Sequence, residues 1–189
     1  PCRPGFGNSE PAASRSAVNE GAVAIGALMD HLGIERCPMV GLINGLVPIL
    51  QFEATNPQRV ESITNLGACL PLDTARRIRK LPFQQRVFLQ LAVRAPKACE
   101  FVARTGLRGA QARGPEFMLA RHYAASPTDL ETAFDPENFS LLMASVSMLF
   151  AQGMQAFVDD LRLIAHPFGP MLSDGRAPLR MIAGSQDPI

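Results

Sequence analysis

Three histidines and four cysteines are the residues of this sequence best suited to proton transfer, nucleophilic attack or metal binding. Histidine changes charge near neutral pH, and cysteines at short spacings bind metals or exchange disulfides. The cysteines here are widely separated and fit no metal-binding or redox spacing; the seven residues are His31, His122, His166, Cys2, Cys37, Cys69 and Cys99. We therefore expect no metal and no cofactor, and we expect reduced thiols, as in a cytoplasmic protein.

Composition excludes several classes of partner. The 189 residues are 47% hydrophobic and 19% charged with a formal net charge of +1, as in a globular domain without an electrostatic surface for nucleic acid or anionic membrane. A short basic cluster, Arg76-Arg77 with Arg79-Lys80, favours a solvated helix face over a phosphate site. The most apolar stretch, residues 37–52, is too short and too interrupted to span a membrane. Pro1 starts a loop-like segment and the chain stops after a strand-like run, so we expect a fragment of a longer protein.

The elements that would position any site begin with a crossover unit. Residues 16–32 have apolar side chains at helical spacing, which predicts a helix that ends before Gly33. Residues 38–42 and 60–66 read as buried strands, and residues 44–55 between them read as a helix with Pro48 in its first turn. Strand, helix and strand at this spacing predict two parallel strands. The apolar residues that define the first helix are Val18, Ala22, Ile25, Leu28, Met29 and Leu32.

The next ninety residues contain helical patterns and no strand pattern. We expect helices over roughly residues 73–94, 96–105, 115–125 and 136–164, followed by a strand over 179–184. The sequence therefore predicts a parallel-sheet core at residues 1–71, a helical insertion at 72–165 and a return to the core at 166–189.

Several segments, in order along the chain, resemble the α/β-hydrolases. One segment is similar to the loop after the fourth strand of that family: Arg3-Pro4-Gly5-Phe6-Gly7-Asn8-Ser9. A second is similar to the family's nucleophile elbow: Val40-Gly41-Leu42-Ile43-Asn44-Gly45-Leu46. A third segment is similar to the turn after the family's elbow helix: Asn56-Pro57-Gln58-Arg59-Val60. A fourth is similar to the strand end that presents the catalytic acid: Ala183-Gly184-Ser185-Gln186-Asp187-Pro188-Ile189. The resemblance implies an α/β fold with a partial α/β-hydrolase-type parallel sheet core and a helical cap insertion.

The elbow motif of that family, G-x-S-x-G, holds a nucleophile at positive φ between a strand and a helix. Gly41 and Gly45 match its glycines, and Asn44 matches the residue whose backbone N–H helps to stabilise the oxyanion. Ile43 occupies the nucleophile position and has no group that can attack a carbonyl. A β-branched residue at positive φ costs about 1–3 kcal/mol, so either the strain is retained or the sharp turn has moved to Asn44. A well-packed strand–helix turn is favoured over a catalytic role for either residue.

The resemblance also assigns an acid and leaves the base unassigned. Asp187 is the candidate acid, which would orient a histidine, although Asp-Pro is also a common turn former. Asp73 is a weaker candidate for the same role. None of the three histidines lies at the position that matches the family's base.

Two functions remain open from the sequence. The chain is nominally an ester- or acyl-type small-molecule hydrolase, catalytically incompetent as it stands because Ile43 replaces the nucleophile and the matching histidine is absent. The alternative is a non-catalytic domain that binds a small ligand between cap and core, as a sensor. The cap resembles that of some bacterial hydrolase-like domains joined to transcriptional regulators. The expected partner is a small molecule rather than nucleic acid or membrane, and the sequence does not indicate an oligomeric state.

Overall fold

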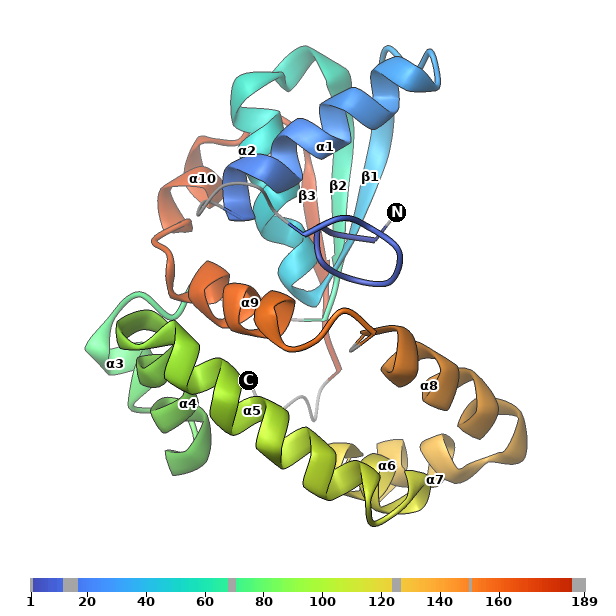
Figure 1. Cartoon of the computed structure of the whole chain (residues 1–189). Coiled ribbons are helices and arrows are strands. Elements are labelled where there is room, and N and C mark those ends of the chain that lie inside the picture. Colours follow the sequence, from blue (N-terminus) through green and yellow to red (C-terminus); the bar gives the residue numbers. More distant parts are fainter. Residues whose placement is uncertain (1, 12–16, 68–70, 124–126, 150, 185–189) are drawn as a thin grey trace.

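A computed structural model describes residues 2–11, 17–67, 71–123, 127–149 and 151–184. Its three strands, β1 (Cys37–Leu42), β2 (Val60–Leu66) and β3 (Leu179–Ile182), form one parallel sheet in the order β1-β2-β3. The predicted crossover unit is confirmed, because β1 pairs in parallel with β2 and the helix between them lies against the sheet. Figure 1 shows the sheet with α1, α2 and α10 in one part of the molecule and α3–α8 in the other, on either side of α9.

The helices around the sheet follow from the apolar pattern of the sequence. Helix α1 (Ala17–His31) ends just before Gly33, and α2 (Leu46–Thr55) places Pro48 in its first turn. Two short helical turns, η1 (Ile43–Gly45) and η2 (Pro57–Arg59), precede and follow α2. Of the apolar residues that predicted this helix, Ala22 and Met29 are buried, whereas Leu28 is exposed on the outer side of α1 and Leu32, just after its end, is also exposed.

The insertion contains more helices than predicted. The expected helix at 73–94 is split into α3 (Ala75–Ile78) and α4 (Phe83–Arg94), because Pro82 cannot donate a helical hydrogen bond. The expected helix at 136–164 is split into α8 (Pro136–Leu149) and α9 (Gln155–Ala165), separated by Gly153 at φ +98°. The remaining helices are α5 (Pro96–Gln111), α6 (Pro115–Tyr123), α7 (Pro127–Phe134) and α10 (Gly169–Asp174). No strand lies between β2 and β3 in the described residues, but the exact division at residues 71 and 165 stays a prediction.

Helix α9 joins two hydrophobic cores. Its Leu163 is buried with the residues of β1, β2, α1 and α2, and its Val158 is buried with Ala92 and Cys99 of α4 and α5. Burial also raises the pKa of the Cys99 thiol, which keeps it protonated and unreactive. The insertion is therefore attached to the sheet core mainly through α9.

One face of the sheet is open in the described structure. Val40 and Leu42 of β1 are 68% and 67% exposed, and Leu66 and Ile182, which pair with Leu42 across the sheet, are also exposed. Parallel sheets are normally covered on both faces, so these apolar side chains form a surface that other polypeptide or a ligand can cover. Among the described helices, none combines the length and the apolar character needed to cross a membrane.

Candidate active-site elbow

The turn from β1 into α2 keeps the strained geometry of an elbow. Ile43 has φ +49°, and no other non-glycine residue in the described ranges has a positive φ. The alternative of a relaxed turn centred on Asn44 is therefore wrong. The Ile43 side chain is 47% exposed, beyond the last residue of β1. The turn thus presents an apolar side chain where the family motif presents a nucleophile.

The two glycines of the motif differ in how strongly the turn requires them. A Cβ on Gly41 would lie 3.0 Å from both the Leu46 nitrogen and Asn65 Oδ1, so a larger residue would collide with backbone that cannot move freely. Gly45 has a helical φ of −62° and open space around it in the described structure. The close approach of β1 to the start of α2 therefore depends on Gly41, and Gly45 is not needed for space.

The end of β2 supports the elbow from the neighbouring strand. Asn65 is fully buried opposite Gly41, and its Nδ2 donates a hydrogen bond of 2.6 Å to the Gly67 carbonyl oxygen. Gly67 adopts φ +82°, and a Cβ there would lie 3.0 Å from Ile43 Cγ1. Because Gly67 has no side chain, the Ile43 side chain can pack against the backbone of the adjacent loop. Asn65 was not identified from the sequence, although it lies two residues after the buried Ile63 and so projects from the same face of β2.

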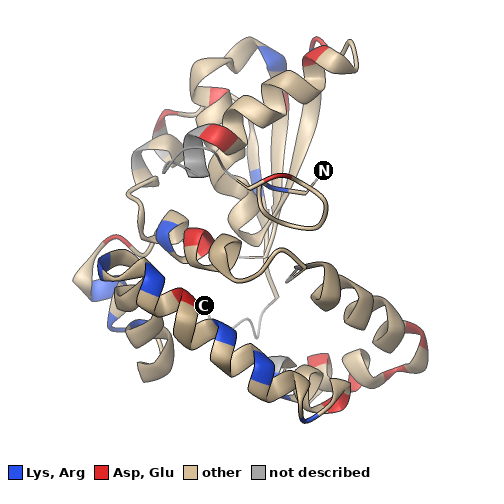
Figure 2. Ribbon diagram, viewed as in Figure 1, with Lys and Arg blue, Asp and Glu red and all other residues tan. Residues whose placement is uncertain are grey.

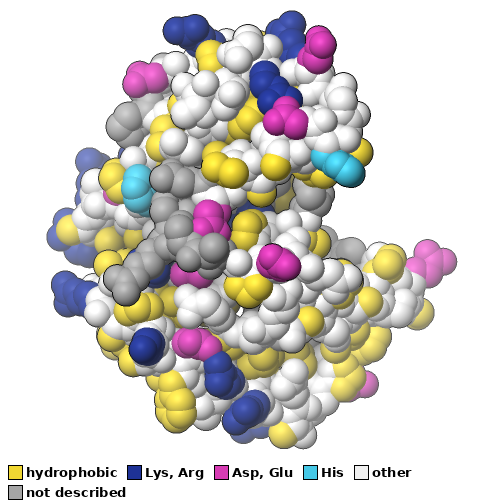
Figure 3. Space-filling model, turned by 45° about the horizontal axis from the view of Figure 1, so that its top comes forward, with side chains coloured by type: hydrophobic (Ala, Val, Ile, Leu, Met, Phe, Trp, Pro, Cys, Tyr) yellow, Lys and Arg dark blue, Asp and Glu magenta, His cyan; other side chains and the backbone are white. Residues whose placement is uncertain are grey.

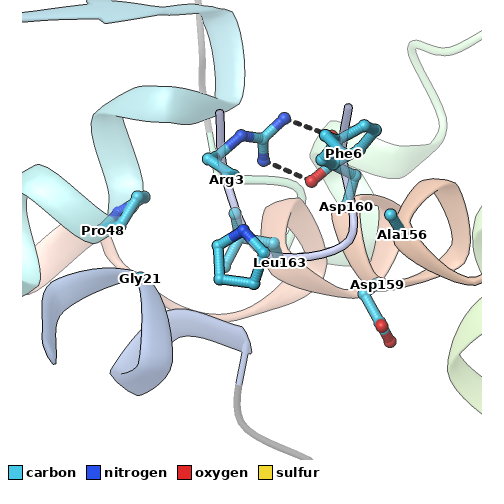
Figure 4. Close-up of a pocket in the computed structure, with 9 residues that line it drawn as sticks. Arg3, Phe6, Gly21, Pro48, Ala156, Asp159, Asp160 and Leu163 are labelled. Atoms are coloured by element: carbon cyan, nitrogen blue, oxygen red, sulfur yellow. Dashed lines mark hydrogen bonds and ion pairs between the residues drawn. The ribbon is translucent and has the colours of Figure 1, made fainter. Parts of the chain in front are cut away.

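A polar cluster lies next to the elbow, between the N-terminal loop and α9. Arg3 forms two hydrogen bonds with the Asp160 carboxylate, one of them 2.6 Å from Nη2 to Oδ2 (Figure 4). Asn44 Nδ2 donates to the same Oδ2 at 3.5 Å. Burial raises the pKa of Asp160, while Arg3 and Asn44 act in the opposite direction. The cluster ties three segments that are distant in the sequence: the loop at residues 2–11, the elbow and α9.

The other candidate residues are not brought to the elbow. Asp187 lies outside the described residues. Asp73 accepts a 2.8 Å hydrogen bond from Arg77 at the start of α3, which is a local structural role. His31 and His166 are exposed at the ends of α1 and α9. No group of three or more His, Cys, Asp or Glu within the described part of the chain could hold a metal ion.

Two cavities flank α9, and neither is lined by Ile43. One lies beside the Arg3–Asp160 pair, bounded by Phe6, Gly21 and Pro48 (Figure 4), and the other lies between α3, α4 and the end of α9. The cavity beside Arg3 and Asp160 lies between residues of the predicted core and α9 of the predicted insertion, but the binding of a ligand between cap and core stays a prediction.

Replacing Ile43 with glycine is expected to raise the free energy of unfolding by about 1 kcal/mol. Glycine adopts φ +49° without the penalty of a β-branched residue, and its greater freedom in the unfolded chain offsets part of the gain. Leu42→Gly is the matched control, because the Leu42 side chain is also exposed but the residue has an ordinary φ of −108° and should lose stability. Urea denaturation of both variants measures the difference. Equal losses in the two variants would show that Ile43 is not strained.

No protein-family model matches the sequence, and no curated protein matches it. Among solved structures, an epoxide hydrolase A from Mycobacterium thermoresistibile superposes with a TM-score of 0.64 at 16% identity, over 97% of this chain and 65% of that one. A hydrolase from Pseudomonas aeruginosa gives a TM-score of 0.62 at 16% identity, over 96% and 58% of the two chains. An α/β-hydrolase fold protein from Nakamurella multipartita gives 0.57 at 20% identity, over 98% and 64%.

These likenesses establish the fold and nothing finer. The predicted resemblance is confirmed at that level, because nearly the whole of this chain follows the α/β-hydrolase fold with a helical insertion. The chain spans 58–65% of the length of these structures.

Proposed function

We propose that this chain, which has the α/β-hydrolase fold, binds a small apolar molecule at its elbow and does not hydrolyse it. The observation that carries the proposal is Ile43 at φ +49° with an exposed side chain. The strained turn has been kept while the side chain it presents can only make apolar contacts. Ligands of open α/β sheets bind beyond the carboxyl ends of the strands, which is where Ile43 lies.

The ends of all three strands support an apolar ligand. Leu42, Leu66 and Ile182 are register partners across the sheet, and each is at least 39% exposed. Residues paired in this way project from the same face of a sheet, so they form one apolar row beside Ile43. We call Ile43 with this row the elbow surface. An apolar molecule lying on it would remove these side chains from water.

The nominal hydrolase function is less well supported by the elbow. Ester or acyl hydrolysis of this type begins with attack by a side-chain nucleophile, which Ile43 cannot provide. Asp160 is the carboxylate next to the turn, but Arg3 and Asn44 occupy its oxygens. The binding function requires neither group to react.

An uncharged short ester, p-nitrophenyl butyrate, tests both functions in one experiment. We expect saturable binding, seen as changes in the protein's NMR spectrum, without release of p-nitrophenol above the spontaneous rate. Ile43→Asp should weaken binding at least about tenfold, because a charge at the elbow surface must be desolvated by the ligand. Val23→Asp, at an exposed apolar position on α1, should leave binding unchanged.

Two results would contradict the proposal. One is hydrolysis by the unaltered protein, and the other is equal affinity in the two aspartate variants. Ile43→Ser is expected to remain without turnover; turnover in that variant would instead favour a hydrolase whose remaining machinery is intact.

A further inference from the structure

A groove lies on the helical insertion, away from the elbow. It is formed by α3, α4 and the C-terminal end of α9, and its cavity volume is about 360 Å³. None of its lining residues precedes Ala75, so it shares no residue with the elbow surface. The residues that matter here are three apolar side chains and three arginines: Ile78, Leu89, Val93, Arg79, Arg86 and Arg94. A groove of this size suits a small molecule.

Arg86 has a buried donor that the protein itself does not satisfy. Its Nε is buried and has no hydrogen-bond partner in the described structure. Its guanidinium carbon lies 5.9 Å from the centre of the Phe83 ring, which leaves the hydrogen-bonding capacity of Nε unused. A buried donor on a charged group is costly when unpaired, so native proteins normally supply an acceptor. The missing acceptor should carry negative charge.

The surroundings of Arg86 are strongly basic in a chain that is nearly neutral. Residues 72–98 contain seven Lys or Arg residues and a single acidic one, Asp73, which is paired with Arg77. Figure 2 shows that the ribbon of α3, α4 and α5 carries most of its charged positions as basic residues, while acidic residues gather near α6 and α7. The described ion pairs include none of Arg79, Arg86 and Arg94. The groove therefore attracts an anion.

The groove also has an apolar floor. Arg86, Gln90 and Arg94 follow one another at helical spacing on α4, and Leu89 and Val93 form the adjacent row. On the left of Figure 3, where Figure 1 places α3, basic side chains alternate with hydrophobic ones on the surface. A purely solvated helix face, which the sequence favours for Arg76 to Lys80, explains neither this floor nor the buried Nε of Arg86.

We propose that this groove binds a medium-chain fatty carboxylate. The carboxylate accepts hydrogen bonds from Arg86, with Arg79 and Arg94 adding charge, and the alkyl chain lies on Ile78, Leu89 and Val93. A guanidinium and a carboxylate can form two parallel hydrogen bonds in one plane. The apolar floor can bind the alkyl chain. The carboxylate would thus supply an acceptor for the buried Nε of Arg86, and the alkyl chain would cover the apolar floor.

Calorimetric titration of the 189-residue chain with decanoate, below its micelle-forming concentration, tests the proposal. Acetate lacks the tail and decanol lacks the charge, so acetate, and decanol in the Ile43→Asp variant whose elbow surface is charged, should each bind at least about tenfold more weakly than decanoate. The affinity for decanoate should fall as sodium chloride is raised, because the contact is ionic. Acetate binding as tightly as decanoate, or decanol binding as tightly as decanoate in the Ile43→Asp variant, would overturn the assignment.

Arg86→Met removes the buried donor while keeping a long apolar side chain. This variant should be at least as stable as the original protein without ligand, yet lose about tenfold or more in decanoate affinity. Arg94→Gln changes an exposed residue, so folding is not at risk, and it should lose about threefold. Arg108→Gln, which removes an exposed arginine from α5 outside the groove, and Ile43→Asp should both leave decanoate affinity unchanged. Unchanged affinity in Arg86→Met and Arg94→Gln, or loss in Ile43→Asp, would overturn the proposal.

Discussion

Replacing Glu53 with alanine is expected to lower the free energy of unfolding by about 3 kcal/mol. Glu53 lies on α2 and is only 2% exposed. Its Oε1 accepts hydrogen bonds from the backbone N–H groups of Arg176 at 2.6 Å and Ala177 at 3.0 Å. Alanine would leave both donors unpaired and open a cavity, and the two costs add.

Glu53→Gln keeps the volume and a hydrogen-bond acceptor and removes only the charge. The glutamine side-chain oxygen can still accept from both backbone groups, so the expected loss is about 1 kcal/mol. Glu35→Ala, at an exposed glutamate in the turn before β1, should change stability by less than about 0.5 kcal/mol. Urea denaturation followed by circular dichroism gives the stabilities, and amide hydrogen exchange reports Arg176 and Ala177 directly. Equal losses in the alanine and glutamine variants would contradict this expectation, because they would show that the charge of Glu53, rather than its hydrogen bonds and volume, carries the stability.

The position of Glu53 gives these hydrogen bonds a functional consequence. Helix α2 begins at the elbow, and Arg176 and Ala177 lead into β3, whose far end precedes the predicted acid Asp187. Glu53 therefore fixes the elbow helix relative to the strand that should present the acid. We expect its loss to disturb the elbow surface as well as the stability.

The helical spacing of the sequence could have indicated that Glu53 is buried, although a charged residue is normally expected at the surface. Leu46, Ile49 and Leu50 define the buried side of α2, and position 53 falls on the same side at helical spacing. A charged residue there needs buried partners, but those partners are backbone groups 123 and 124 residues away. Their location depends on how α10 and β3 pack, which no local pattern encodes.

The elbow illustrates the same limit. Strand, turn and helix could be predicted because apolar spacing and Gly41 are local features. Whether Ile43 would keep a positive φ could not be predicted, because both a strained and a relaxed turn satisfy the same residues. The answer depends on tertiary contacts, namely the Leu46 backbone against Gly41 and the Gly67 loop against Ile43. Tertiary packing outweighs a local preference of about 1–3 kcal/mol.

Arg3→Ala is expected to lower the free energy of unfolding by about 2–3 kcal/mol at neutral pH. It leaves the largely buried Asp160 carboxylate without its counter-charge. Asp160→Asn made in the same chain should restore about 1–2 kcal/mol, because an amide is far less costly to bury than an unpaired carboxylate. Such a rescue distinguishes a buried charge from a general loss of packing by Arg3.

The pH dependence of this loss gives the sharpest check. Burial raises the pKa of Asp160 above its ordinary value of 3.8 in the folded protein, so the folded state binds this proton more readily than the unfolded state. The stability from this group is fully present below pH 3.8 and is lost as pH rises through the raised pKa. Removing Arg3 raises that pKa further, so Arg3→Ala should differ least from the original protein near pH 3.8 and most at neutral pH. Arg162→Ala breaks the more exposed pair with Asp159 and should cost less than about 1 kcal/mol. An Arg3→Ala loss that stays constant from acid to neutral pH would contradict the assignment.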